Sequence, residues 1–344
     1  MKLVVLEPLG IPDENLRALL TEALDAVGAQ EDAATSANTT TAASGTSAAT
    51  TTASTPAVEL ITYPTRAEDE ETLIERSADA DIIVVSNIKY PASVMRHNPN
   101  LKYICVAFTG YDHIDIAYCR EHGIQVSNCA GYSTVAVADL VFALVISLYR
   151  NICTLNNIVR EGGTKDGLVG PELEGKRFGI VGLGAIGSRV ARIACAFGCD
   201  VVAYSRTPKT IEGVTMVSFE ELLTTSDIVS IHVPQTPETI NMIGAAELAL
   251  MKPNALLINC ARGPIVNSEA LAQALNEGRI AGAGIDVLET EPPFPAEHPL
   301  LNSKNTIVTP HVAFASTQAM EKRAVIVANN VASYLAGETQ NVVS

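Results

Sequence analysis

The chain has 344 residues, a length that predicts two domains rather than one. Acidic side chains outnumber basic ones by 38 to 23, and the formal net charge of −15 argues against a nucleic-acid partner or an anionic membrane surface. No signal peptide opens the chain, the longest apolar run (residues 135–149) is too short to span a bilayer comfortably, and the seven cysteines form no CxxC or Cys/His cluster. We therefore expect a reduced, cytoplasmic protein that binds no membrane and holds no metal ion.

The N-terminal part of the chain alternates short apolar runs with helical patterns, as in a parallel sheet whose strands are joined by helices. Pro12 and Asp13 are predicted to begin the first helix, and Gly28 to end it. Strands are predicted at residues 2–6, 58–63, 81–86, 101–107 and 124–127, and helices at 13–27, 68–77, from about 91, and at 114–122.

One stretch interrupts this alternation. Residues 31–57 are almost only Ala, Thr and Ser, without apolar periodicity and without an aromatic side chain. Such a segment cannot bury enough apolar surface to offset the entropy lost on ordering it. We interpret it as a disordered insertion between a helix and the next strand, because too little chain precedes it to form a domain.

Two loops of this part of the chain follow predicted strands, which is where ligands of parallel sheets bind. One loop begins with Asn87, and the other, residues 108–112, contains Thr109 and Gly110. Gly110 could bring backbone N–H groups close to an anion, and a plain turn explains the same residues equally well.

Residues 176–206 have the order strand, glycine turn, helix, strand. A buried apolar run at residues 178–181 is followed by Gly182, Gly184 and Gly187 in GxGxxG spacing. In a dinucleotide site one such glycine makes the tight turn, one lets the backbone approach the pyrophosphate, and one lets helix and strand pack closely. Because the flanking strand and helix are both present, the pattern predicts a dinucleotide bound at the helix N-terminus.

The residues after the second of these strands bear on the choice of cofactor. NAD sites carry an acidic residue here that binds the ribose 2′-hydroxyl, whereas this chain has Ser205, Arg206 and Thr207. No carboxylate would repel a 2′-phosphate, and a guanidinium and a hydroxyl could bind one. We therefore expect NAD(P), with NADP favoured over NAD; the alternative is an exposed loop arginine and a cofactor choice made elsewhere.

The rest of the chain continues the same alternation. An apolar helix at residues 133–149 is predicted to be buried between domains or against another subunit, and residues 151–175 to form a polar, glycine-rich connection. Further strands are predicted at residues 214–217, 228–233, 255–260, 280–285 and 305–308, and further helices at 219–224, 245–250, 268–277 and 315–335.

Three polar side chains lie just past successive strand ends on the edge where the cofactor should bind: Arg262, Glu291 and His311. A guanidinium can bind a carboxylate through two hydrogen bonds, and a histidine can give a proton to a carbonyl oxygen as hydride reaches the carbon. A carboxylate beside the histidine orients the ring and stabilises its charged form. Each residue alone has a plain structural explanation, but together, beside a dinucleotide fold, they favour reversible reduction of a 2-oxo acid.

Four motifs resemble the D-isomer-specific 2-hydroxyacid dehydrogenase family, and the resemblance covers nearly the whole chain outside the insertion. The motifs are VGLGAIG at residues 181–187, NCARGPIVN at 259–267, GIDVLETEPP at 284–293 and TPHVAF at 309–314. The resemblance implies an α/β fold of two Rossmann-like domains with doubly wound parallel sheets, a flavodoxin-like substrate domain and an NAD(P)-binding domain. It also implies that Arg262, Glu291 and His311 are the catalytic residues.

Further site residues are implied by the same resemblance. Backbone groups around Thr109 and Gly110 would help Arg262 to hold the substrate carboxylate, and side chains that select the substrate would come from the loops at Asn87 and 108–111. Asp286 would contact the nicotinamide carboxamide. The rest of the cofactor site implied by the family comprises the glycine turn together with Ala185, Ile186, Thr239, Cys260 and Ala261.

The domains implied by the family are discontinuous. Residues 1–127 and 312–344 would form the substrate domain, and residues 128–311 the dinucleotide-binding domain, with hinges near Ser127 and His311. Family members are usually homodimers joined through the cofactor domain, and residues 133–149 with the polar stretch after them resemble that interface.

The leading interpretation is an NAD(P)-dependent reductase of small 2-oxo acids such as hydroxypyruvate, glyoxylate or pyruvate. The alternative is an NAD(H)-sensing, corepressor-like binding protein of the same fold, and the complete set of Arg262, Glu291 and His311 favours the enzyme. Formate dehydrogenase resembles this family but pairs its histidine with Gln, so Glu291 argues against it. The end of the chain at Ser344 argues against the long, serine-regulated phosphoglycerate dehydrogenases. Pocket shape, rather than any motif, decides among the oxo acids.

Overall fold

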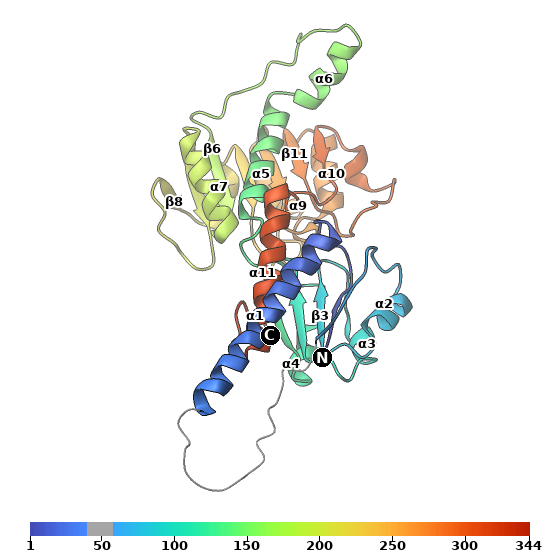
Figure 1. The fold of residues 1–344 in the computed structure, drawn as a ribbon. Coiled ribbons are helices and arrows are strands. Elements are labelled where there is room, and N and C mark those ends of the chain that lie inside the picture. The colour runs from blue at the N-terminus through green and yellow to red at the C-terminus, as the bar shows by residue number, and fades with distance from the viewer. Residues whose placement is uncertain (40–57) are drawn as a thin grey trace. The chain divides into compact units, whose positions relative to one another are not determined.

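A computed structural model describes residues 1–39 and 58–344 of the chain, with side chains outside 29–39. The chain divides into two compact units (Figure 1). The first unit consists of Met1–Tyr132 and Thr317–Ser344, and the second of Ser133–Ser316.

The first unit contains a five-stranded sheet in the order β2-β1-β3-β4-β5. All of its strand pairs are parallel, and β3 and β4 are buried at every position, as expected for strands covered on both faces. The five predicted strands of this part of the chain are confirmed. They are β1 (Lys2–Val5), β2 (Glu59–Thr62), β3 (Ile82–Val85), β4 (Tyr103–Val106) and β5 (Gln125–Asn128).

The helices of the first unit follow the predicted positions, with one correction. They are α1 (Asp13–Thr39), α2 (Glu70–Ser77), α3 (Ala92–Met95), α4 (Ile116–Glu121) and α11 (Thr317–Leu335). Helix α1 was predicted to end at Gly28 but continues to Thr39, so the prediction of disorder is wrong for residues 31–39. One glycine inside a helix costs only about 1 kcal/mol, and the alanines that follow are the best helix formers. The remainder of the predicted insertion, residues 40–57, lies outside the described residues.

Two segments that are distant in sequence complete the first unit. Helix α11 packs beside α1 and against β4 (Figure 1). The last residues of the chain run antiparallel to β5, where Ser127 pairs with Val342 and the N–H of Val343 donates to the carbonyl of Val126 at 2.9 Å. This pairing covers a sheet edge that would otherwise expose unpaired backbone groups.

The second unit contains a seven-stranded parallel sheet in the order β12-β11-β10-β9-β6-β7-β8. Its side chains alternate between two apolar cores, one on each face; Phe178 and Ile180 of β6, for example, join one core and Val181 joins the other. The seven predicted strands are confirmed as β6 (Arg177–Val181), β7 (Asp200–Tyr204), β8 (Val214–Met216), β9 (Ile228–Ile231), β10 (Leu256–Asn259), β11 (Gly282–Ile285) and β12 (Thr306–Val308).

Helices cover both faces of this second sheet. They are α5 (Thr134–Tyr149), α7 (Ala185–Ala196), α8 (Phe219–Thr225), α9 (Ala245–Leu250) and α10 (Ser268–Asn276), with short 3-10 turns at Gly263–Ile265 and Pro299–Asn302. The apolar helix α5 was expected between domains or against a subunit; it packs on α7 and on β10, β11 and β12 of its own unit. Its apolar composition is explained by that contact.

The connection predicted as polar and glycine-rich contains a helix, α6 (Ile152–Arg160). Its apolar residues Ile152, Leu155 and Val159 recur at helical spacing, a signal that the sequence analysis missed. No residue of α6 is buried within the described parts of the chain, and within the second unit the helix projects away from the sheet (Figure 1). Across the described residues, no single helix is long and apolar enough to cross a bilayer; α5 and α6 reach that length and composition only together, with a 56° bend between them.

Candidate active site

The three candidate catalytic residues follow three neighbouring strands of the second sheet. Arg262 comes after β10, Glu291 after β11 and His311 after β12, and these strands are adjacent in the sheet. Because the strands are parallel, the loops after them emerge at one edge, which is where open α/β sheets bind ligands. The glycine turn after β6 emerges at the same edge.

His311 and Glu291 form a close pair. The Nδ1 atom of His311 lies 2.9 Å from each carboxylate oxygen of Glu291. The histidine side chain is only 10% exposed, whereas that of Glu291 is 43% exposed. A carboxylate at Nδ1 holds the proton on that nitrogen, so Nε2 is the atom at which the ring can gain or lose a proton.

The backbone around His311 is held by the buried residue Asp286. The N–H of His311 donates to the carbonyl of Asp286 at 2.7 Å, and His311 has a φ of +52°, in the left-handed region. The Asp286 carboxylate is fully buried and accepts from the N–H groups of Val312 and Ala313, both at 2.9 Å, and from the hydroxyl of Thr309. These bonds fix the turn that carries His311.

Burial raises the pKa of Asp286, and the hydrogen bonds from Thr309, Val312 and Ala313, with the nearby His311, oppose that rise. An ionised carboxylate is tolerated in an interior only where such bonds replace its hydration. The role of Asp286 in positioning His311 was not foreseen from the sequence. Its contact with the nicotinamide carboxamide stays a prediction.

Arg262 lies in a turn that is shaped by Asn259. The Asn259 side chain accepts from the N–H of Ala261 at 3.0 Å and donates to the carbonyl of Arg262 at 2.9 Å. The Arg262 guanidinium is partly buried, and its Nη1 donates to the carbonyl of Ala261 at 2.8 Å. A side chain at Gly263 would collide with the backbone of Leu288, so the missing Cβ lets this turn approach the loop that leads to Glu291. Asn259 and Gly263 belong to the motif NCARGPIVN at residues 259–267, but the sequence did not indicate that they shape the turn of Arg262.

The glycine turn has the geometry that a pyrophosphate requires. Gly182 has a φ of +100°, and a Cβ there would lie 2.8 Å from the carbonyl oxygen of His232. A Cβ at Gly187 would collide with the carbonyl of Gly182, so this glycine lets α7 pack onto the end of β6. A Cβ on Gly184, by contrast, meets no atom of the described residues within 4 Å. Open space therefore lies at the N-terminus of α7, where N–H groups without helical partners can bind phosphate.

The other predicted cofactor residues are distributed around the same edge. Ala185 and Ile186 begin α7, Ser205, Arg206 and Thr207 follow β7, and Cys260 and Ala261 follow β10. The Thr239 hydroxyl closes the loop after β9, where it accepts from the N–H of Thr236 at 2.8 Å and donates to the carbonyl of Pro234 at 2.7 Å. Burial raises the pKa of the Cys260 thiol, which is therefore protonated at neutral pH. The residues present fit a dinucleotide.

The predicted substrate residues Asn87, Thr109 and Gly110 lie in the first unit. Asn87 follows β3, and Thr109 and Gly110 follow the neighbouring strand β4, so they share one edge of the first sheet. The side chain of Asn128, at the end of β5, donates to the carbonyl of Thr109 at 2.7 Å. Within residues 1–39 and 58–344, no group of three His, Cys, Asp or Glu side chains is arranged to hold a metal ion.

A doubly wound sheet with an open glycine turn, and a histidine–carboxylate pair and an arginine at the same edge, define a nicotinamide-dinucleotide-dependent oxidoreductase. The family described as D-isomer specific 2-hydroxyacid dehydrogenase, NAD binding domain, matches residues 142–313. The chain belongs to the D-isomer-specific 2-hydroxyacid dehydrogenase family, and it is an enzyme that acts on the CH–OH group of 2-hydroxy acids with NAD(P).

Individual relatives support this assignment. The chain is 42% identical to a glyoxylate reductase of Thermococcus litoralis over 82% of this chain and 88% of the relative. It is 34% identical to a hydroxypyruvate reductase of Blautia hydrogenotrophica over 83% and 92% of the two chains. An acyclic imino acid reductase solved with NADPH and D-Arg superposes with a TM-score of 0.83 at 29% identity and covers both chains completely. None of the three favours the corepressor-like alternative.

One half-buried histidine of this edge predicts a pH dependence of stability. His232 follows β9 with its Nε2 atom 2.8 Å from the hydroxyl of Ser230, and burial lowers its pKa from 6.5 to about 3. Below pH 6.5 the unfolded chain therefore binds a proton that the folded chain does not, so stability falls as the pH falls toward 3. Since the ring keeps some contact with solvent, we expect wild type to lose about 2 kcal/mol more than His232→Gln between about pH 6.5 and 4.5. Urea unfolding followed by circular dichroism measures this; equal losses in the two proteins would contradict it.

Proposed function

We propose that this enzyme reduces small 2-oxo acids of the glyoxylate, hydroxypyruvate and pyruvate class to the D-2-hydroxy acids, and oxidises those products in reverse. The observation that carries the proposal is the contact of His311 Nδ1 with both oxygens of Glu291. His311 and Glu291 follow the neighbouring strands β12 and β11, and Arg262 follows β10 on the other side of β11. The names of the relatives point to the same class of substrate.

Each of the three side chains has a distinct task in this reaction. Arg262 binds the substrate carboxylate through two hydrogen bonds and so fixes the direction of the neighbouring carbonyl. His311 gives the proton on Nε2 to the carbonyl oxygen during reduction and takes it from the hydroxyl during oxidation. Glu291 stabilises the charged ring and holds its orientation. The nicotinamide of the bound cofactor supplies or accepts the hydride.

The second unit is the dinucleotide-binding domain of this proposal, and the first is the substrate domain. In the first unit, backbone groups of Thr109 and Gly110 would help to hold the substrate carboxylate, and the Asn87 loop would contribute to selectivity. The edge that carries these residues belongs to parallel strands, as does the edge of the second sheet.

The reaction is tested with wild type and His311→Asn, because Asn tolerates the left-handed backbone at this position better than Ala. Wild type should oxidise NADPH or NADH with at least one of the three oxo acids. The kcat of the variant should fall about a thousandfold, since the proton donor is lost, while its affinity for NAD(P)H in fluorescence titration stays unchanged. Turnover by the variant within about tenfold of wild type would remove His311 from the chemistry.

For the cofactor we propose a preference for NADPH over NADH. Ser205, Arg206 and Thr207 follow β7, and Arg206 is exposed to an incoming ligand. A hydrogen bond with Thr236 lowers the pKa of Glu238, and the positive charge of Arg206 lowers it further. The guanidinium thus lies within electrostatic reach of the loop after β9, which also carries Thr239. The Arg206 guanidinium could therefore bind a 2′-phosphate on the adenosine ribose between the loops that follow β7 and β9.

The preference is tested by the substitution Arg206→Ala, with Lys209→Ala as a matched control in the same exposed loop. We expect the KM for NADPH to rise about tenfold or more in the first variant, because a charge-assisted hydrogen bond to phosphate is lost. The KM for NADH should stay within about twofold of wild type in both variants. If wild type prefers NADH, or if Arg206→Ala changes both cofactors equally, Arg206 is only a loop charge.

We also propose that the enzyme is a homodimer in which a second copy covers α6. This helix is strongly amphipathic, and its own chain buries none of its residues within the described parts. The exposed fractions are 47% at Ile152 and 66% at Val159, and 84% at Val169 in the connection that follows. Amphipathic helices stabilise by burying their apolar side, so a partner surface is required.

The dimer is tested by Val159→Asp, with Val325→Asp on α11 as the control because Val325 is also exposed, by 44%. A carboxylate in an apolar contact leaves an unpaired buried charge, so Val159→Asp should sediment as a monomer. The control should keep the mass of wild type in analytical ultracentrifugation. A monomeric wild type, or a Val159→Asp protein that stays dimeric, would contradict the proposed interface.

A further inference from the structure

Two buried charged residues of the first unit lie directly beneath the loops assigned to the substrate. We propose that Glu7 and Arg323 are positioning residues, which hold the Asn87 loop and the Phe108–Gly110 loop in the arrangement that binds the oxo acid. The inference rests on the proposed function, because that function assigns these loops to the substrate. Neither residue belongs to a motif quoted for the family.

Glu7 forms hydrogen bonds with the backbone of the first loop on both sides of Asn87. The residue is 2% exposed, and its Oε1 atom accepts from the N–H of Ser86 at 2.8 Å and from the N–H of Ile88 at 3.0 Å. Its other oxygen lies 3.3 Å from Nε of Arg66, which is exposed. One carboxylate oxygen therefore fixes the residues before and after Asn87.

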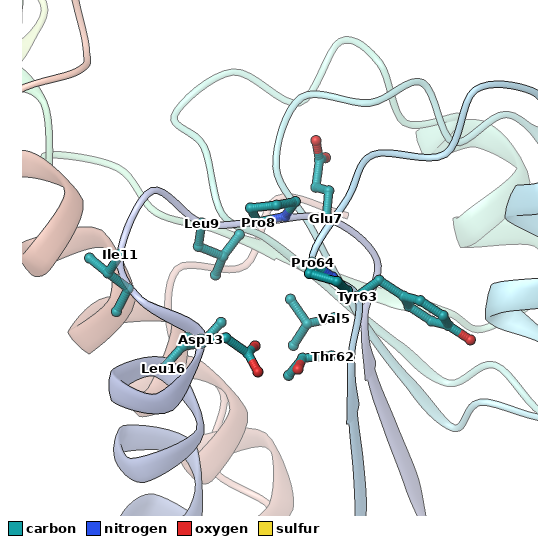
Figure 2. A pocket seen from close by; sticks show the side chains of 10 residues that line it. All are labelled: Val5, Glu7, Pro8, Leu9, Ile11, Asp13, Leu16, Thr62, Tyr63 and Pro64. Atoms are coloured by element: carbon teal, nitrogen blue, oxygen red, sulfur yellow. The ribbon is translucent and has the colours of Figure 1, made fainter.

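The direction of the Glu7 side chain agrees with this task. A small cavity of about 170 Å³ lies at the ends of β1 and β2, with Asp13 and Thr62 among its lining residues. Figure 2 shows the Glu7 carboxylate at the rim of this cavity, pointing away from Asp13 and Thr62. The carboxylate thus serves the Asn87 loop rather than the cavity.

Arg323 reaches the bases of both loops from α11. Its guanidinium is buried, with the residue 3% exposed, and Nη1 donates to the hydroxyl of Ser86 at 3.1 Å and to the carbonyl of Ala107 at 3.4 Å. Nη2 donates to the carbonyl of Leu9. One guanidinium therefore joins the loop after β1 to the ends of β3 and β4. Ser86 is bonded by Glu7 through its N–H and by Arg323 through its hydroxyl.

An aromatic contact extends the reach of Arg323 to the second loop. The guanidinium carbon lies 5.7 Å from the ring centre of Tyr132, and that ring lies 6.1 Å from the ring of Phe108. Phe108 is the first residue of the loop that carries Thr109 and Gly110. A shift of Arg323 would therefore be felt at Ser86, at Ala107 and at Phe108 together.

Stability alone does not account for two charged side chains at this place. Burying a charge costs hydration free energy, and apolar side chains of similar volume usually stabilise a core at least as well. The advantage of a charged group is the directionality of its hydrogen bonds, because the N–H donors of a guanidinium or the oxygen of a carboxylate fix their partners in one geometry. Glu7 bonds to the N–H groups on both sides of Asn87, and Arg323 bonds to Ser86 and Ala107, where β3 and β4 lead into the substrate loops.

The first test compares Arg323→Lys and Glu7→Leu with wild type in steady-state kinetics and in hydrogen exchange. Lysine keeps the charge, but its single nitrogen cannot occupy both the position of Nη1 at Ser86 and Ala107 and that of Nη2 at Leu9. Leucine leaves the N–H groups of Ser86 and Ile88 without their acceptor. We expect the KM for the oxo acid to rise about tenfold or more in both variants, with the KM for NAD(P)H within about twofold of wild type. Exchange of amide hydrogens should accelerate in residues 86–90 and 108–112.

Two further variants separate positioning from general stability. Glu7→Gln keeps the acceptor oxygen and should rescue the KM for the oxo acid to within about threefold of wild type. Leu20→Ala removes a fully buried side chain of α1 away from the loops; it should lower the melting temperature while both KM values stay unchanged. If Glu7→Leu does not fold, Arg323→Lys and Ser86→Ala carry the comparison.

Different outcomes refute the inference and the proposed function. Unchanged loop exchange and an unchanged KM for the oxo acid in Arg323→Lys would refute the positioning role. The same would follow if Leu20→Ala, matched in melting temperature, raised the KM for the oxo acid equally. A wild type that turns over none of the oxo acids would refute the proposed function instead, and the exchange measurement would still decide whether Glu7 and Arg323 hold the two loops.

Discussion

The carboxylate of Asp286 is fully buried at the end of β11, and it accepts hydrogen bonds from Thr309, Val312 and Ala313 in the turn after β12. That turn carries His311 in a left-handed backbone conformation, which is unfavourable for a side chain with a Cβ unless its surroundings compensate. The hydrogen bonds to Asp286 compensate for it. They also hold the turn that carries His311 against the end of β11, the strand whose following loop carries Glu291.

Close backbone approaches impose the second constraint on this edge of the sheet. Helix α7 can lie on β6 only because Gly187 has no Cβ, and the turn that carries Arg262 can meet the loop after β11 only because Gly263 has none. Gly184 differs, since the described atoms leave the space above it open. Gly187 and Gly263 are required by close packing, whereas Gly184 leaves space for a ligand, so glycine has two different physical roles at this edge.

The sequence predicted all twelve strands, because each is a short apolar run bounded by turn residues. The central strands are buried on both faces of their parallel sheets, and the edge strands β2, β8 and β12 are only partly buried. It also placed Arg262, Glu291 and His311 at strand ends, although it could not show that His311 and Glu291 touch. It missed α6, none of whose residues is fully buried in the described chain, and it ended α1 too early at Gly28. Asp286, Glu7 and Arg323 could not be assigned their positioning contacts, since the partners of each lie far away in sequence and only the fold brings them together.

The two units solve one physical problem in the same way. A loop at the end of a parallel strand lies at the surface and has few apolar contacts of its own. Hydrogen bonds from buried side chains beneath the loop therefore have to fix its conformation. In the second unit a buried carboxylate, that of Asp286, imposes it by accepting N–H groups of the His311 turn. In the first unit the carboxylate of Glu7 accepts from the N–H groups on both sides of Asn87. Arg323 complements it by donating to the carbonyl of Ala107, at the start of the other substrate loop. A neutral side chain could bond to these groups, but charged ones form stronger and more directional hydrogen bonds, which suits sites whose geometry matters more than their contribution to stability.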